Sequence, residues 1–218
     1  MAYNKAAIER LKERYRRIRP TIERRMEEFH ALWQTATDER LFAEMAFCLL
    51  TPQSKAKVCW RAIENMLKDN ILMDGDAVQI EGYLTGVRFK HNKARHIVEA
   101  REKFCGTEKC RIRGILSGFE SPFDAREWLV KNIKGYGYKE ASHFLRNIGI
   151  GDDLAILDRH ILKNLKLAGV IEVIPKSLSR KKYPEIERLM RDFSEYIGIP
   201  MSHLDLLLWF TETGEVFK

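Results

Sequence analysis

Several features that define other protein classes are scarce or missing in this sequence. It has only four cysteines among 218 residues, and no two of them form a Cys-x-x-Cys pair. The cysteines therefore give no sign of a metal site, and an intracellular compartment argues against disulfides. No run of about 18 apolar residues occurs, which excludes an ordinary transmembrane helix. No signal peptide opens the chain, so we expect a soluble protein of the cytoplasm, with its cysteines reduced.

Strand patterns are missing as well, whereas helical patterns run through the whole chain. No alternation of apolar and polar residues extends beyond four positions, and apolar residues instead recur at helical spacing. We therefore predict an all-α fold, in which residues 1–218 form one unit of two helical lobes with a cleft between them. The expected helices cover Ala6–Trp33 with a break or kink at Pro20, Asp38–Leu50, a segment capped by Ser54 and ending at Lys68, a segment starting near Asn92, Pro122–Asn132, Tyr138–Ile148, Asp158–Ala168, a segment from Pro184 to Gly198, and a last one between Ser202 and Gly214.

A tight connection between two of these helices is the most informative stretch. The helices Pro122–Asn132 and Tyr138–Ile148 are joined by Ile133-Lys134-Gly135-Tyr136-Gly137. Glycines can adopt positive φ and let another molecule approach closely, and the amides that open the second helix lack partners within it. A phosphate suits such a place. Two glycines alone are equally compatible with a tight turn that binds nothing.

Two charged residues near this hairpin (residues 122–148) make the pattern more specific. Lys139 follows Gly137 by two residues, and Asp158 opens the next helix in the run Ile156-Leu157-Asp158-Arg159-His160. Together these residues resemble the helix-hairpin-helix DNA glycosylases, whose hairpin is followed by an apolar-apolar-Asp-x-His helix start. A lysine at this position marks the bifunctional members, which excise a base and then cut the strand. The chain is most similar to the compact 8-oxoguanine DNA glycosylase/AP lyases of the second type.

The resemblance implies catalytic roles for Lys139 and Asp158. A neutral Lys139 amine would attack the sugar carbon that carries the damaged base, displace the base and leave a Schiff base, from which β-elimination nicks the strand. Asp158 would stabilise the positive charge that develops on the sugar and orient or deprotonate the lysine. An adjacent carboxylate also stabilises the ammonium form, and the sequence does not decide between these opposite effects. His160 is expected to hydrogen-bond behind Asp158.

The same resemblance implies the groups that hold double-stranded DNA. Gln53, in the turn between two helices, would fill the space left by the flipped nucleotide, with Ser54 and Lys55 near phosphates and with Gly135 and Gly137 binding the backbone. The excess of 38 Lys and Arg over 31 Asp and Glu permits nucleic-acid binding without proving it.

Three residues are expected to contact the damaged base. Phe89 could stack on it, although a core position under its loop is an equal alternative from the sequence. Lys218 ends the Val216-Phe217-Lys218 sequence and would help to distinguish 8-oxoguanine from guanine, as in the similar family; without that resemblance it would be taken as a frayed terminus. Trp209 could line the base pocket, although a tryptophan on an apolar helix face is more often part of a core.

The expected function is base excision repair of 8-oxoguanine, with DNA containing 8-oxoguanine or abasic sites as partner. No metal and no cofactor are expected, because no cysteine follows Cys110 that could serve the iron–sulfur cluster of some relatives. We expect a monomer that acts on the nucleoid. Two alternatives remain open, namely an endonuclease III-like enzyme for oxidised pyrimidines and a hairpin protein that binds DNA without catalysis.

Overall fold

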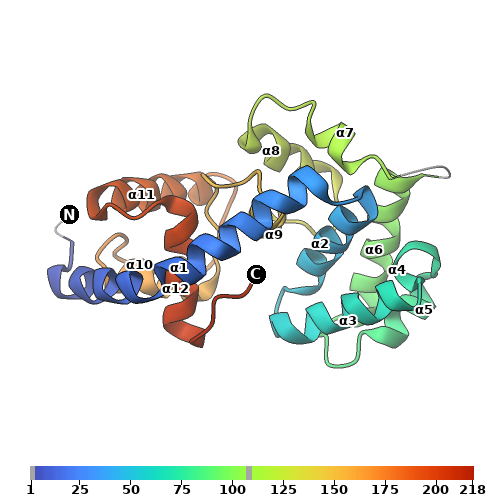
Figure 1. Ribbon diagram of the computed structural model, residues 1–218, viewed down its shortest axis with the longest axis horizontal. Coiled ribbons are helices and arrows are strands. Elements are labelled where there is room, and N and C mark those ends of the chain that lie inside the picture. The colour runs from blue at the N-terminus through green and yellow to red at the C-terminus, as the bar shows by residue number, and fades with distance from the viewer. Residues whose placement is uncertain (1–2, 107–109) are drawn as a thin grey trace.

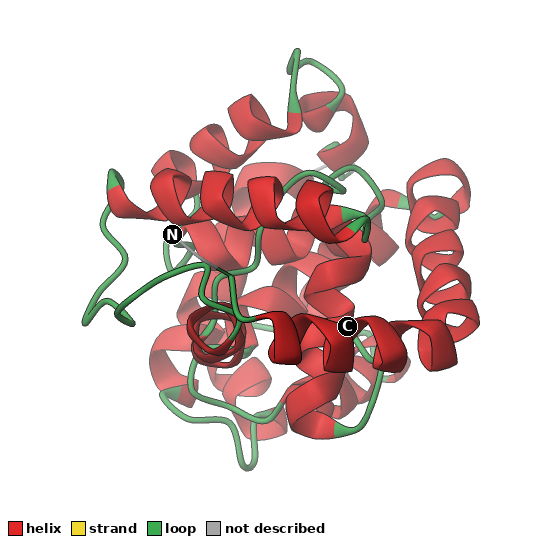
Figure 2. Cartoon of the chain, turned by 90° about the vertical axis from the view of Figure 1, so that its left-hand side faces the viewer, coloured by secondary structure: helices red, strands yellow, loops and turns green. Residues whose placement is uncertain are grey.

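The computed structural model describes residues 3–106 and 110–218, and regular structure there is entirely helical. Figure 2 shows helices and loops and no strand in this part of the chain, so the predicted all-α class is confirmed. The helices are α1 (Lys5–Thr35), α2 (Asp38–Leu50), α3 (Ala56–Lys68), α4 (Ile71–Asp74), α5 (Ala77–Tyr83), α6 (Lys90–Cys105), α7 (Ile112–Leu116), α8 (Pro122–Asn132), α9 (Tyr138–Asn147), α10 (Arg159–Leu167), α11 (Lys182–Ile197) and α12 (Met201–Thr213).

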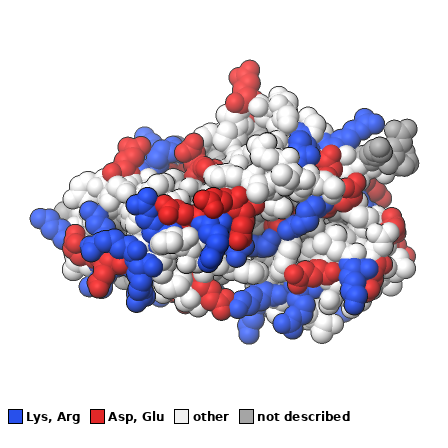
Figure 3. Space-filling model, in the orientation of Figure 1, with Lys and Arg blue, Asp and Glu red and all other residues white. Residues whose placement is uncertain are grey.

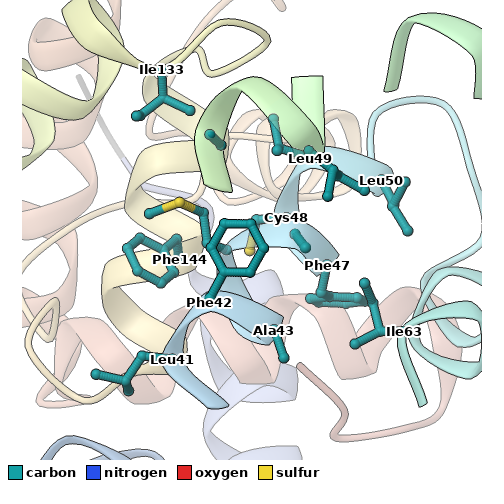
Figure 4. Close-up of a cluster of buried hydrophobic side chains, with 14 of the residues drawn as sticks. Leu41, Phe42, Ala43, Phe47, Cys48, Leu49, Leu50, Ile63, Ile133 and Phe144 are labelled. Carbon is teal, nitrogen blue, oxygen red and sulfur yellow. The ribbon is translucent and has the colours of Figure 1, made fainter. Parts of the chain in front are cut away.

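The buried side chains separate into two clusters, which we call the first and the second core. The first core is built on α2, which buries every residue from Leu41 to Leu50, all of them apolar except Glu44. Figure 4 shows part of this core, where Ile63 of α3, Ile133 of the hairpin and Phe144 of α9 surround the α2 side chains. The second core joins one face of α1 to α10, α11 and α12. In Figure 1 the helices of the second core gather on the left and those of the first core on the right.

Helix α1 belongs to both halves of the molecule. Its buried residues from Ile8 to Phe29 lie in the second core, and Trp33 near its end packs against the first. Of the predicted break or kink at Pro20, the break is wrong, because α1 continues through this residue. Pro20 is exposed, so water can satisfy the carbonyl group that loses its helical partner.

Helix ends follow local capping signals in most places. Thr37 and Asp158 cap α2 and α10, and each accepts a hydrogen bond from a backbone amide of the first turn. Ser54 does not cap α3, because the helix starts at Ala56 and the Ser54 hydroxyl is used elsewhere. The short helices α4 and α5 were not expected, since each is too short for a clear apolar period.

The expectation that no cysteine would be oxidised is also wrong. Cys105 and Cys110 form a disulfide at the end of α6. The chain turns back there, and the Arg111 amide donates to the Phe104 carbonyl at 2.8 Å, which brings Cys110 onto the helix end. Cys48 and Cys59 are free and buried, as packing residues should be. No group of three or more His, Cys, Asp or Glu residues in the described ranges could hold a metal ion.

The surface is mixed in charge. Figure 3 shows lysine and arginine side chains dispersed over one face, with acidic side chains between them. Among the residues that the structure describes, no helix is long and apolar enough to span a bilayer.

Candidate active site

The hairpin between α8 and α9 is held closely against the first core. Gly135 has φ +88°, and a Cβ atom there would lie 2.5 Å from Nδ1 of His96. The residue must therefore be glycine for both its conformation and its packing. The Tyr136 hydroxyl donates to the Met45 carbonyl at 2.9 Å, which fastens the hairpin to α2.

Gly137 differs from Gly135 in a way that the sequence did not suggest. Its φ is −100°, so it does not need the left-handed region. Its amide donates to the Glu140 carboxylate at 3.1 Å, which caps α9. A phosphate can reach this amide only after Glu140 has released it. Phosphate binding by the hairpin glycines therefore remains a prediction.

Lys139 lies at the start of α9 and faces the turn after α2. Its side chain is 22% exposed, and its ammonium group donates to the Thr51 hydroxyl at 3.1 Å. Glu140 Oε1 is 3.6 Å away. In the described part of the chain the ammonium is thus paired with Glu140 and not with Asp158. The turn between α2 and α3 and the start of α9 hold the amine in place from two sides.

Asp158 is fixed by its own helix. One carboxylate oxygen accepts from the amides of His160 and Ile161, both at 2.8 Å. These bonds place the carboxylate at the positive end of the α10 dipole. The second oxygen takes no part in the cap.

A buried carboxyl group, Asp205 of α12, links the surroundings of Lys139 and Asp158. Burial raises the pKa of Asp205 to about 6, while the Arg146 guanidinium, 3.4 Å away, lowers it. The charge of Asp158 raises this pKa and that of Lys139 lowers it, so both groups lie within electrostatic range of Asp205. Sequence reasoning missed this residue. The one feature of the sequence that could have indicated it is the presence of a carboxylate within the apolar run of α12.

The turn between α2 and α3 presents Gln53 to solvent in an unusual conformation. Gln53 is exposed and has φ +55°, which non-glycine residues rarely adopt. Lys93 of α6 holds the turn from beneath, because its buried ammonium donates to the carbonyls of Leu50 and Pro52 at 2.8 and 2.7 Å and to the Ser54 hydroxyl at 3.1 Å. Burial lowers the pKa of Lys93 to about 8. Sequence reasoning gave Lys93 no such role.

The loop before α6 lies beside this turn. Ser54 connects the two, because its hydroxyl also accepts from the Arg88 amide at 3.0 Å. Phe89 follows with φ +56° and is 56% exposed, so the core position considered for it is wrong. Gln53 and Phe89 are thus two exposed residues in left-handed conformations on neighbouring loops. Lys55 is exposed at the start of α3.

Lys218 is folded into the protein and is not a frayed end. Its ammonium group pairs with Glu44 of α2 and lies 3.5 Å from the centre of the Trp60 ring of α3. Glu44 is fully buried and also accepts from Arg40 at 2.8 Å and from Asn147 at 3.1 Å. Burial lowers the pKa of Lys218, and the Glu44 carboxylate opposes this. In Figure 1 the C-terminus lies between α12 and α2, next to the first core.

Trp209 of α12 is partly buried and lies outside both cores. Its ring meets His160 edge to face, with centroids 5.3 Å apart. His160 in turn lies 3.6 Å from Glu212. Trp209 therefore lies next to the start of α10, in contact with His160. Its role in lining the base pocket remains a prediction.

This arrangement agrees with what comparisons with known proteins reveal. A family model described as 8-oxoguanine DNA glycosylase, with a helix-hairpin-helix motif, matches residues 22–199. The chain belongs to this glycosylase family. The resemblance noted in the sequence is thereby confirmed.

Individual family members are similar over nearly the whole chain. The 8-oxoguanine DNA glycosylase/AP lyase of Fusobacterium nucleatum is 46% identical over 204 residues, 94% of each chain. The crystal structure of the Methanocaldococcus jannaschii 8-oxoguanine DNA glycosylase superposes with a TM-score of 0.86 at 40% identity, over 97% of this chain and 95% of that one. The M. jannaschii glycosylase/lyase in complex with a 15-mer DNA containing 8-oxoguanine gives the same TM-score at 39% identity, over 97% and 99%.

Proposed function

We propose that this protein excises 8-oxoguanine from double-stranded DNA and then cleaves the strand at the abasic site. The observation that carries the proposal is the position of Lys139, partly buried at the start of α9 and within electrostatic range of the same buried carboxyl group as Asp158. A relative of 39% identity binds DNA that contains this lesion. The 46% identical relative from Fusobacterium carries the same pair of activities in its name.

In the proposed reaction Lys139 is the nucleophile. Its amine must first lose a proton, and the Glu140 carboxylate lies 3.6 Å from it. The neutral amine then bonds to C1′ of the deoxyribose while the bond from C1′ to the base breaks, and the base leaves with the electron pair and takes up a proton. The sugar ring opens to a Schiff base. Loss of a C2′ proton breaks the C3′–O bond, and hydrolysis of the Schiff base returns the free lysine.

Asp158 acts on the charge that develops while the base departs. A carboxylate fixed by two amide hydrogen bonds cannot easily turn away, so its field is set before the reaction starts. Within the described residues Lys139 pairs with Glu140 and not with Asp158, so we assign Asp158 to the sugar cation and not to the lysine.

The turn carrying Gln53 and the loop carrying Phe89 are suited to open the duplex. Both side chains are exposed, and both backbones are held in strained conformations by surrounding contacts. An amide can enter the base stack and hydrogen-bond to the unpaired partner, and an aromatic ring can stack on a base. Ser54, Lys55 and the hairpin glycines would then lie near backbone phosphates.

We also propose that the whole chain works as one unit, as a monomer in the cytoplasm where the nucleoid lies. The lysine chemistry requires neither a metal nor a cofactor.

A strand-cleavage assay tests the proposed function. Duplexes containing 8-oxoguanine, thymine glycol or no damage are incubated with the protein and separated on a denaturing gel. We expect cleavage of the 8-oxoguanine strand alone. Preference for thymine glycol would indicate an endonuclease III-like enzyme, and binding without cleavage would indicate a non-catalytic hairpin protein.

Lys218 provides a prediction about recognition of the lesion. We expect Lys218→Ala to lower 8-oxoguanine excision by about 10- to 100-fold, since one good contact to a base discriminates by roughly 1–3 kcal/mol. Trp209 and Phe89 would complete the base pocket in this proposal. Cleavage at pre-formed abasic sites, where no base is read, should be nearly unchanged.

Lys57→Ala is the matched control for Lys218. Lys57 of α3 also pairs with a residue of the C-terminal segment, Glu215, but the Lys57 side chain is 65% exposed. Its removal should affect neither activity. Equal losses of both activities in Lys218→Ala would mean that the buried ion pair with Glu44 is structural.

A further inference from the structure

His143 is a buried side chain that the structure leaves without a partner. It lies one helical turn after Lys139 on α9 and is 6% exposed. Neither ring nitrogen has a hydrogen-bond partner within the described residues. An unpaired buried polar group costs about 1–3 kcal/mol, so such groups are uncommon in folded proteins. The fold therefore keeps a polar ring here at the expense of stability.

The surroundings of His143 keep its ring uncharged. Burial lowers its pKa well below the usual value, and the positive charges of Lys139, Arg146 and Lys218 lower it further. The Lys218 main chain faces the ring and opposes this, without reaching hydrogen-bond geometry. A neutral imidazole has one donor and one acceptor nitrogen. Neither nitrogen makes a hydrogen bond to the described residues, and both are covered, so a molecule that contacts them must first displace the groups above them.

The position of the ring connects the two ends of the proposed site. The His143 ring packs edge to face against Phe47 of α2, whose ring centre is 5.5 Å away at an interplanar angle of 72°. Phe47 also contacts the rings of Trp60 and Phe217, beside the ammonium of Lys218. His143 thus stands between the nucleophile at the start of α9 and the folded-in chain end. A base that is flipped toward Lys139 would lie next to His143.

We propose that His143 contacts the flipped 8-oxoguanine directly, through a hydrogen bond between a ring nitrogen and a polar edge of the base. This rests on the proposed function. The proposal explains why an unpartnered imidazole occurs at this place, because the base supplies the missing partner. His143 is then a base-contacting residue, distinct from Lys139, which acts on the sugar.

His143→Leu separates this role from a structural one. Leucine removes the unpaired polar atoms and fills an apolar space, so the melting temperature should stay the same or rise. Single-turnover excision of 8-oxoguanine should fall about tenfold or more, as expected for the loss of one hydrogen bond to a base. The rate of cleavage at abasic sites, where no base is contacted, should change by less than about threefold. His143→Gln, which retains a donor and an acceptor, should recover part of the excision rate.

His30→Leu is the matched control, because His30 is exposed and pairs only with Asp152 in the described structure. It should leave both activities unchanged. A clear drop in the melting temperature of His143→Leu would show that the ring is held by protein partners and would overturn the proposal. Equal losses of excision and abasic-site cleavage would mean that the ring acts through Lys139, and unchanged excision would mean no contact with the base. A wild-type protein that cleaves no 8-oxoguanine strand would instead overturn the proposed function.

Discussion

Substitution of Lys139 by glutamine is expected to abolish covalent capture of the protein on damaged DNA. In the wild type, borohydride should reduce the Schiff base during reaction with an 8-oxoguanine duplex and leave a permanent protein–DNA adduct. Glutamine is similar to lysine in length but has no amine, so no adduct should form and the strand should not be cleaved. Glutamine can still hydrogen-bond to Thr51, which keeps the start of α9 in place. Denaturing electrophoresis measures the adduct.

Lys134→Gln is the control for this experiment. Lys134 lies in the same hairpin, but its side chain is 60% exposed and pairs with Glu99 at 3.3 Å. Its loss removes a positive charge near DNA without removing the proposed nucleophile, so an adduct should still form. An undiminished adduct in Lys139→Gln would place the nucleophile elsewhere.

Asp158→Asn should bind 8-oxoguanine DNA with nearly wild-type affinity and excise it on the order of a hundredfold more slowly or worse. Asparagine caps helices as well as aspartate does, so the amides of His160 and Ile161 keep their acceptor and α10 stays intact. Only the negative charge is lost, and in the proposed reaction that charge acts in the transition state. Binding by fluorescence anisotropy and single-turnover excision together measure the effect.

Asp158→Ala shows how much of any loss comes from the cap. It removes both hydrogen bonds and should lower stability by about 1 kcal/mol, whereas Asp158→Asn should melt like the wild type. If Asp158→Asn excised as fast as the wild type, Asp158 would serve as a helix cap alone. If it lost affinity and activity in proportion, its role would lie in binding.

The sequence predicted those parts of the site that lie close together along the chain. The hairpin, Lys139 and the cap at Asp158 all depend on spacing over a few residues, as do most helix starts. Glu44 and Lys218 meet across 174 positions, and Lys93 reaches the Leu50 carbonyl across 43. Such contacts arise only when separate helices pack. For this reason the supports of the turn at Gln53 and of the chain end escaped prediction.

Buried polar residues within apolar helices were the other limit. Asp205 and His143 stand in helical stretches where the apolar pattern signals only a core, and nothing local reveals which neighbours they face. The positive φ of Gln53 was equally hidden, since no sequence rule assigns it to glutamine. Its environment imposes that conformation.

The continuity of α1 has a consequence for how DNA is handled. At 1.5 Å per residue this helix is about 45 Å long, and it is anchored in the second core along one face and against the first core near its end. Hinge motion between the two halves would have to shear packed side chains on both sides. We therefore expect the protein to meet DNA as a stiff template, so that the duplex bears the distortion needed to extrude a nucleotide. Base pairs already weakened by damage or mismatch yield at the lowest cost, so the mechanics of the DNA itself contribute to the choice of target.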